Sequence, residues 1–136
     1  KEIEGIRFGI EPEHGNVVQN AVLARRLLDT LGSERLAIIM DAANLLSGQA
    51  HEARPDLLAQ AFELLGGDIG LAHGKDLTDG ESHDDVLPGT GYVNFRQYLR
   101  LLRESPYEGP LVMHGFTESQ VPAAVAYVDG VLKEMD

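Results

Sequence analysis

Four short apolar runs, each ending on a side chain that can bind a divalent metal ion, constrain the fold of this chain most. The residues at these ends are Glu11, Asp41, His73 and His114. Short apolar runs bounded by glycine and polar turns are typical of buried β-strands. The intervals between them, about 30 to 40 residues, match strand-helix-strand crossover units. The sequence therefore predicts parallel strands whose C-terminal ends carry the chemistry.

Amphipathic helices are expected between these strands. The predicted strands are 6–10, 36–40, 69–73 and about 109–114, and the predicted helices are 17–31, 55–65, 94–104 and about 118–132. Asn16 is the expected N-cap of the first helix. Loops are expected at 42–48 and at 74–91, with His83 solvated in the second. The residues expected on the buried faces of the first and last helices are Val18, Val22, Leu23, Leu27, Leu31, Val121, Val125, Val128 and Leu132.

The size of the chain fits half of a barrel. It has 136 residues, 43% of them hydrophobic, which is enough for one domain with a core. A full (β/α)8 barrel typically needs about 250 residues. A half-barrel leaves two strand edges unpaired, and such edges must be covered. We therefore expect a missing half or a second copy to close the barrel, and we do not expect the isolated chain to be a stable monomer.

Composition excludes several classes of function. Lys and Arg number 11 against 22 Asp and Glu, and the net charge of −11 disfavours binding to nucleic acid. Without cysteine, disulfides and thiolate chemistry are excluded. No apolar run is long enough for a membrane span, and no signal-peptide pattern is present. The expected location is the cytoplasm.

At the strand ends the sequence resembles the xylose isomerase-like TIM barrels, which include sugar phosphate isomerases and epimerases. The pieces GIEPEHGN, IIMDAANLLSG, LAHGKD and PGTGYVNF carry the resemblance, which runs from Gly5 to about Leu132. It implies that residues 1–136 are strands five to eight of a (β/α)8 barrel of about 250–290 residues.

The resemblance also implies a divalent metal at the strand ends. Family members usually carry Glu, Asp, His and Glu at these four points. Glu11, Asp41 and His73 match this pattern, whereas His114 replaces the second Glu. Carboxylates combined with imidazoles suit Mn²⁺, Zn²⁺ or Co²⁺ better than Mg²⁺. The alternative is that Glu11 and Asp41 cap the following loops and that both histidines are ordinary strand-end residues.

Proton transfer is the chemistry that the resemblance implies for Glu11 and His114. In the resembled epimerases two metal-bound glutamates move protons on and off carbon, and only Glu11 remains of that pair. His114 can bind metal, and its ordinary pKa of about 6.5 suits proton transfer. A metal-bound imidazole is a poor base, however, so Glu13, His14 or Glu118 could take over this role.

Four further residues are candidates for binding the substrate: His14, Asn44, Lys75 and Asp76. Asn44 stands where related epimerases carry a substrate-binding histidine, although an Asn after a strand is as often a loop former. Lys75 and Asp76 could orient a hydroxyl or a phosphate, or could pair with each other in the loop. Gly89 and Gly91 are expected to be turn glycines with positive φ.

These observations predict a metal-dependent isomerase or epimerase acting on a sugar or sugar phosphate. The first alternative is a metal-dependent hydrolase or lyase on the same barrel, for which a histidine-richer site is natural. The second is a barrel that binds a sugar without converting it. Isomerisation without addition of water separates the predicted function from the first alternative, and binding without turnover would indicate the second.

Overall fold

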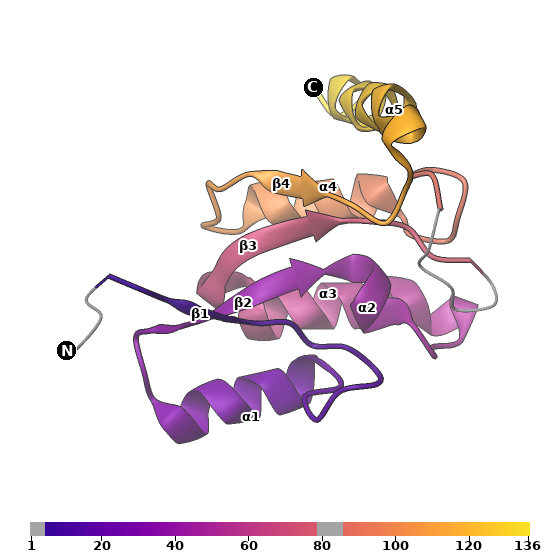
Figure 1. Cartoon of the computed structure of the whole chain (residues 1–136). Helices are drawn as coiled ribbons and strands as arrows, with labels where there is room; N and C mark the ends of the chain where they lie inside the picture. Colours follow the sequence, from indigo (N-terminus) through magenta and orange to yellow (C-terminus); the bar gives the residue numbers. More distant parts are fainter. Residues whose placement is uncertain (1–4, 79–85) are drawn as a thin grey trace.

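The computed structural model describes residues 5–78 and 86–136, which form one four-stranded parallel sheet (Figure 1). In the order β1-β2-β3-β4 across the sheet, the strands are Phe8–Ile10, Leu36–Asp41, Ile69–Gly74 and Leu111–Met113. The α-helices are α1 (Ala21–Leu31), α2 (Ala42–Leu46), α3 (Arg54–Leu65), α4 (Phe95–Glu104) and α5 (Val121–Lys133). Short 3₁₀ turns are η1 (His51–Ala53), η2 (Gly66–Asp68) and η3 (Glu118–Gln120). The predicted succession of parallel βα units is confirmed and is that of part of a TIM barrel.

The hydrophobic core lies between the sheet and the helices. Figure 1 shows α3 and α4 behind the strands, with α1 and α5 beyond the two edges of the sheet. Ile38 and Met40 of β2 belong to the same buried cluster as Leu58 of α3 and Tyr98 of α4. Burying one such apolar side chain contributes about 1.5–3 kcal/mol. On β4, Val112 is 41% exposed between residues that pack against this core, so the opposite face of the sheet is open there.

Helix α1 begins later than predicted and buries a different face. Its N-cap is Asn20, whose side chain accepts a hydrogen bond from the Leu23 amide, whereas Asn16 lies in the preceding turn. In that turn the Glu13 amide donates to the Val18 carbonyl at 3.0 Å, which keeps Val18 out of the helix. The buried residues of α1 are Ala21, Ala24 and Leu28.

The predicted buried face of α5 is also partly wrong. The helix buries Ala124 and Val128, while Val121 and Val125 are exposed. Valine at a three- or four-residue interval predicts an apolar stripe but cannot tell which of two overlapping stripes faces the core. Among the described residues no helix is long and apolar enough to cross a membrane. The cytoplasmic location stays a prediction.

The segment after Asp41 is a helix, not the predicted loop. All five residues of α2 are buried, and Asp41 is its N-cap, with Oδ1 accepting from the Asn44 amide at 3.2 Å. An aspartate at the N-cap satisfies an amide that would otherwise lack a partner. Asp41 therefore both ends β2 and starts α2, and this fixes the direction of its carboxylate.

Candidate metal centre

The parallel sheet brings the predicted strand-end residues to one edge. Glu11 and His114 directly follow β1 and β4, while Asp41 and His73 are register partners on β2 and β3. Ligand atoms of Asp41, His73 and His114 all lie within 4.8 Å of one another. We call these three residues the Asp-His-His cluster. Three of the four predicted ligands thus meet in space, and Glu11 is adjacent to them.

The carboxylate of Asp41 is the centre of the cluster. Its Oδ2 atom lies 3.5 Å from His114 Nε2, 3.7 Å from His73 Nδ1 and 3.6 Å from Lys75 Nζ. The Asp41 side chain is fully buried, whereas that of His73 is 16% exposed and that of His114 is 41% exposed. Three groups that are or can become cationic therefore face one buried anion.

These neighbours shift the proton equilibria of the cluster. Burial by itself would raise the pKa of Asp41, but His114, His73 and the Lys75 ammonium outweigh it and hold the pKa well below its ordinary value. Asp41 in turn raises the pKa of His73, against the opposing effect of burial, and Glu11 adds to this rise. Asp41 is thus an anion at neutral pH, ready to serve as a ligand.

The cluster fits a divalent metal ion. Asp41 Oδ2 and His114 Nε2 are buried and have no hydrogen-bond partner among the described residues. Buried polar atoms in proteins are nearly always paired with protein, water or an ion. One carboxylate oxygen and two imidazole nitrogens are a donor set suited to Zn²⁺, Mn²⁺ or Co²⁺. The two buried atoms without a hydrogen-bond partner and the donor chemistry therefore point to the same kind of ligand.

Glu11 joins the cluster through His73. Its Oε1 atom lies 3.1 Å from His73 Nδ1 and accepts a hydrogen bond of 2.9 Å from the Asn44 side chain. The Glu11 side chain is 30% exposed, so it borders the open face of the site. Its assignment as a fourth metal ligand stays a prediction.

Among the described residues, Lys75 and Asp76 do not pair with each other and have separate partners. Lys75 faces Asp41, as described above. Asp76 is fully buried and accepts four backbone hydrogen bonds of 2.9–3.0 Å from the amides of Leu77, Gly89, Gly91 and Val93. This carboxylate joins Leu77 to the described end of the loop, residues 89–93. A role of Asp76 in binding substrate stays a prediction.

Glycine is required twice where this loop meets Asp76. Gly89 has φ +90°, as predicted, and a Cβ there would lie 2.5 Å from the Tyr127 ring. Gly91 does not have the predicted positive φ. It is needed instead because a Cβ would collide with the Leu77 carbonyl oxygen and with Asp76. His83, predicted to be solvated in this loop, lies outside the described residues.

His14 lies at the rim of the same edge. It is exposed, and its ring sits against the backbone of Gly48, where an added Cβ would be 3.2 Å from the imidazole. Gly48 follows α2, so His14 connects the loop after β1 with the loop after β2. A role in binding substrate stays a prediction.

Tyr98 supports the site from the helix side and was not foreseen. Its hydroxyl lies 2.7 Å from the Met40 carbonyl and 2.9 Å from the His73 carbonyl, and it can donate to either. Burial raises the pKa of Tyr98 well above its ordinary value, so the hydroxyl keeps its proton. It thereby ties together the strand ends that carry Asp41 and His73. In the sequence Tyr98 is one of several apolar residues on the buried stripe of α4, which gives no sign of this contact.

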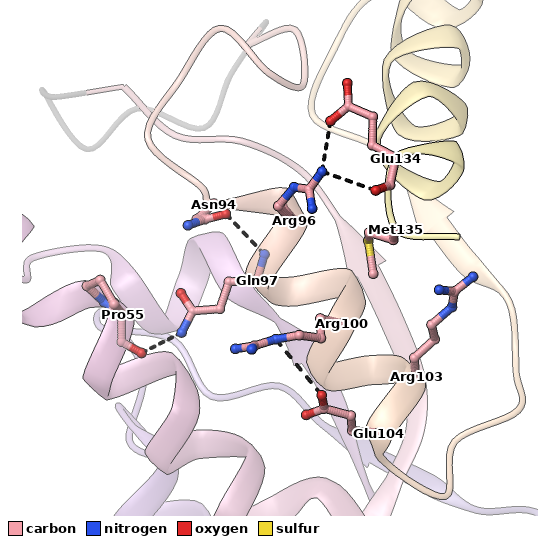
Figure 2. Close-up of a pocket in the computed structure, with 9 residues that line it drawn as sticks. All are labelled: Pro55, Asn94, Arg96, Gln97, Arg100, Arg103, Glu104, Glu134 and Met135. Atoms are coloured by element: carbon pink, nitrogen blue, oxygen red, sulfur yellow. Dashed lines mark hydrogen bonds and ion pairs between the residues drawn. The ribbon is translucent and has the colours of Figure 1, made fainter.

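A hollow of about 690 Å³ lies elsewhere, on the outer side of α4 (Figure 2). Arg96 pairs with Glu134 at 3.0 Å, and the Gln97 side chain donates to the Pro55 carbonyl at 2.8 Å. These contacts join α4 to α3 and to the C-terminal residues. The hollow therefore lies where α4 meets α3 and the C-terminal residues. None of the strand-end residues lines it, so it is separate from the candidate metal centre.

Comparison with solved structures supports the same architecture. The match to a xylose isomerase domain protein from Planctomyces limnophilus covers 94% of this chain and 45% of that protein's chain, with 22% identity and a TM-score of 0.69. The match to a D-tagatose 3-epimerase-like protein covers 95% of this chain and 48% of that protein's chain, with 18% identity and a TM-score of 0.72. A xylose isomerase-like TIM barrel protein from Mycobacterium smegmatis in complex with magnesium matches 95% and 44%, with 18% identity and a TM-score of 0.66.

The chain spans about half the length of these structures. No curated protein gives a significant sequence match. The profile of the xylose isomerase-like TIM barrel family, however, matches residues 2–134, which is nearly the whole chain. By this match and by its parallel βα units, the chain belongs to the xylose isomerase-like TIM barrel family.

Proposed function

We propose that this chain carries the metal site of a sugar isomerase or epimerase. The observation that carries the proposal is the buried Asp41 Oδ2 atom, which faces two imidazoles and has no hydrogen-bond partner among the described residues. The family and the epimerase-like neighbour support the class of reaction. The substrate is a sugar or sugar phosphate, bound as a polyhydroxylated carbonyl compound.

Each residue of the site has a proposed role. Asp41, His73 and His114 hold the ion, with Glu11 as the fourth ligand. The chemistry that a bound divalent ion supplies is polarisation of adjacent carbonyl and hydroxyl oxygens, which acidifies the C–H bond between them. Glu11 takes and returns the proton, since it is the partly exposed carboxylate at the open side of the site. Lys75 and His14 orient the substrate oxygens.

The place of His114 favours a second candidate function. A site of one carboxylate and two imidazoles is a natural one for metal-dependent hydrolysis or lyase chemistry, as in other metalloenzymes. The two candidates differ in a measurable way. An isomerase or epimerase gives a product of the same mass as its substrate, whereas a hydrolase adds the elements of water and a lyase splits the substrate or removes a small molecule from it.

His114 gives the test of the metal site. We expect His114→Ala to lower the affinity for Mn²⁺ or Zn²⁺ by at least about tenfold, because a ligand is lost. His114→Glu should retain binding, since it restores the carboxylate usual in the family. Affinity in the parent should fall as pH is lowered through the raised pKa of His73, because both imidazoles must be neutral to bind.

Calorimetric metal titrations of the parent and both variants check this expectation. His51→Ala, which changes a histidine outside the cluster, is the matched control. If His114→Ala binds the metal ion as tightly as the parent, His114 is not a metal ligand. The same titrations in competition with Mg²⁺ test the expected preference for Mn²⁺, Zn²⁺ or Co²⁺, which is of interest because the M. smegmatis protein was solved with magnesium.

We also propose that further polypeptide closes the barrel. In the described residues β1 and β4 each pair with only one strand, and Val112 is exposed on the open face of the sheet. Either an additional half-barrel or a second copy of this chain would cover these surfaces. Sedimentation of residues 1–136 alone should show self-association or an expanded species. A compact monomer that unfolds cooperatively would contradict this proposal.

A further inference from the structure

Asn44 contacts both carboxylates of the site. It lies on α2 and is 2% exposed. Its side-chain Nδ2 donates to Glu11 Oε1 at 2.9 Å, and its backbone amide donates to Asp41 Oδ1 at 3.2 Å. One residue therefore spans the end of β1 and the end of β2, which are adjacent strands.

These contacts are part of a closed circuit. From Asn44 the path runs to Glu11, then across 3.1 Å from Glu11 Oε1 to His73 Nδ1, and across 3.7 Å from His73 Nδ1 to Asp41 Oδ2. Asp41 Oδ1 returns to the Asn44 amide. A closed set of contacts fixes each member more tightly than separate pairs do, because moving one residue breaks two contacts.

The orientation of the Asn44 amide is set by Glu11. Reversing the amide would place its oxygen against the Glu11 carboxylate, and two acceptors repel. In the observed orientation Asn44 Oδ1 is buried and has no hydrogen-bond partner among the described residues. Leaving such an atom unpaired costs free energy, and an apolar side chain of similar size would avoid that cost. What the amide provides at this position is thus its contact with Glu11.

We infer that Asn44 is a positioning residue that holds the Glu11 carboxylate at the metal centre, instead of a residue that binds the substrate directly. The inference rests on the proposed function in so far as it gives Glu11 a role beside the metal. Residues that hold metal ligands in place commonly change metal affinity 10- to 100-fold when they are replaced. The position of Glu11 can be observed without any metal.

The test compares Asn44→Leu with the matched variant Asn16→Leu. Asn16 Nδ2 also donates to a glutamate, Glu13, at 2.8 Å, but this pair is exposed and outside the cluster. Both variants are made in the parent protein, and crystal structures are determined without metal. In Asn44→Leu we expect Glu11 to leave hydrogen-bond distance of His73 Nδ1 and the Mn²⁺ affinity to fall about 10- to 100-fold. Asn16→Leu should change neither.

Each outcome decides the inference. If Glu11 stays beside His73 in Asn44→Leu, the inference is overturned, whatever the metal affinity. If Glu11 moves but the parent itself binds no metal, the positioning role holds and the proposed function fails. If metal affinity and Glu11 are unchanged while the KM for a sugar rises, Asn44 binds the substrate instead. Asn44→Ala gives the same readings should leucine prevent folding.

Discussion

Asp41→Asn is expected to lower the affinity for a divalent metal ion by more than about 100-fold, the upper range seen when only a supporting residue is lost. The substitution removes the negative charge that faces His73, His114 and Lys75. It keeps an oxygen that can still accept from the Asn44 amide, so the start of α2 is preserved. Metal titration with a parallel measurement of the free energy of unfolding separates loss of the ligand from loss of the fold.

The control for this variant is Asp68→Asn. Asp68 also pairs with a cation, with its Oδ2 2.6 Å from Arg25 Nη1, but it lies before β3 at the other end of the strand and is 38% exposed. Exposed ion pairs contribute little to stability, about 0–1 kcal/mol, and this one is far from any candidate ligand. Metal binding by Asp41→Asn as tight as that of Asp68→Asn would place the metal outside the Asp-His-His cluster.

The second large effect is expected for Asp76→Ala, a loss of about 3–5 kcal/mol in the free energy of unfolding. The carboxylate is fully buried and accepts from four backbone amides. Its removal takes the acceptor away from four amides, two of them in buried and two in part-buried hydrogen bonds, and the alanine methyl group cannot accept a hydrogen bond. Asp76→Asn should cost less, because its remaining oxygen still accepts on one side.

Urea unfolding of both Asp76 variants provides the measurement. Asp129→Ala, an exposed acid on α5, is the matched control and should stay within about 0.5 kcal/mol of the parent. A change in the midpoint without a change in the slope indicates altered stability of the same fold. If Asp76→Ala behaved like Asp129→Ala, the loop would not depend on this carboxylate.

The sequence predicts the positions of the strand ends well because each apolar run stops sharply at a polar residue. Parallel strands in neighbouring positions then bring Asp41, His73 and His114 together, which is a geometric result that needs no side-chain detail. What the apolar pattern could not predict is α2. Five buried residues are too few to show helical periodicity, and only the capping aspartate indicates that a helix follows.

The start of α1 was mispredicted for a different reason. Asn16 and Asn20 are four residues apart, and both have the side chain of a good N-cap. The choice depends on a contact between Glu13 and Val18 that arises only when the preceding loop folds. Likewise, three of the four amides bound by Asp76 and both carbonyls near the Tyr98 hydroxyl lie 13 or more residues away in the chain, and the identity of a residue gives no guide to such contacts.

The two carboxylate oxygens of Asp41 face different partners, and this has a thermodynamic consequence. Oδ1 is engaged by the first turn of α2, which leaves Oδ2 aimed at the imidazoles before any ligand arrives. A side chain that is already held in one rotamer loses little conformational entropy when it binds a ligand. At the proposed metal site, helix α2 would thus raise the affinity for the ion by holding Asp41 in place.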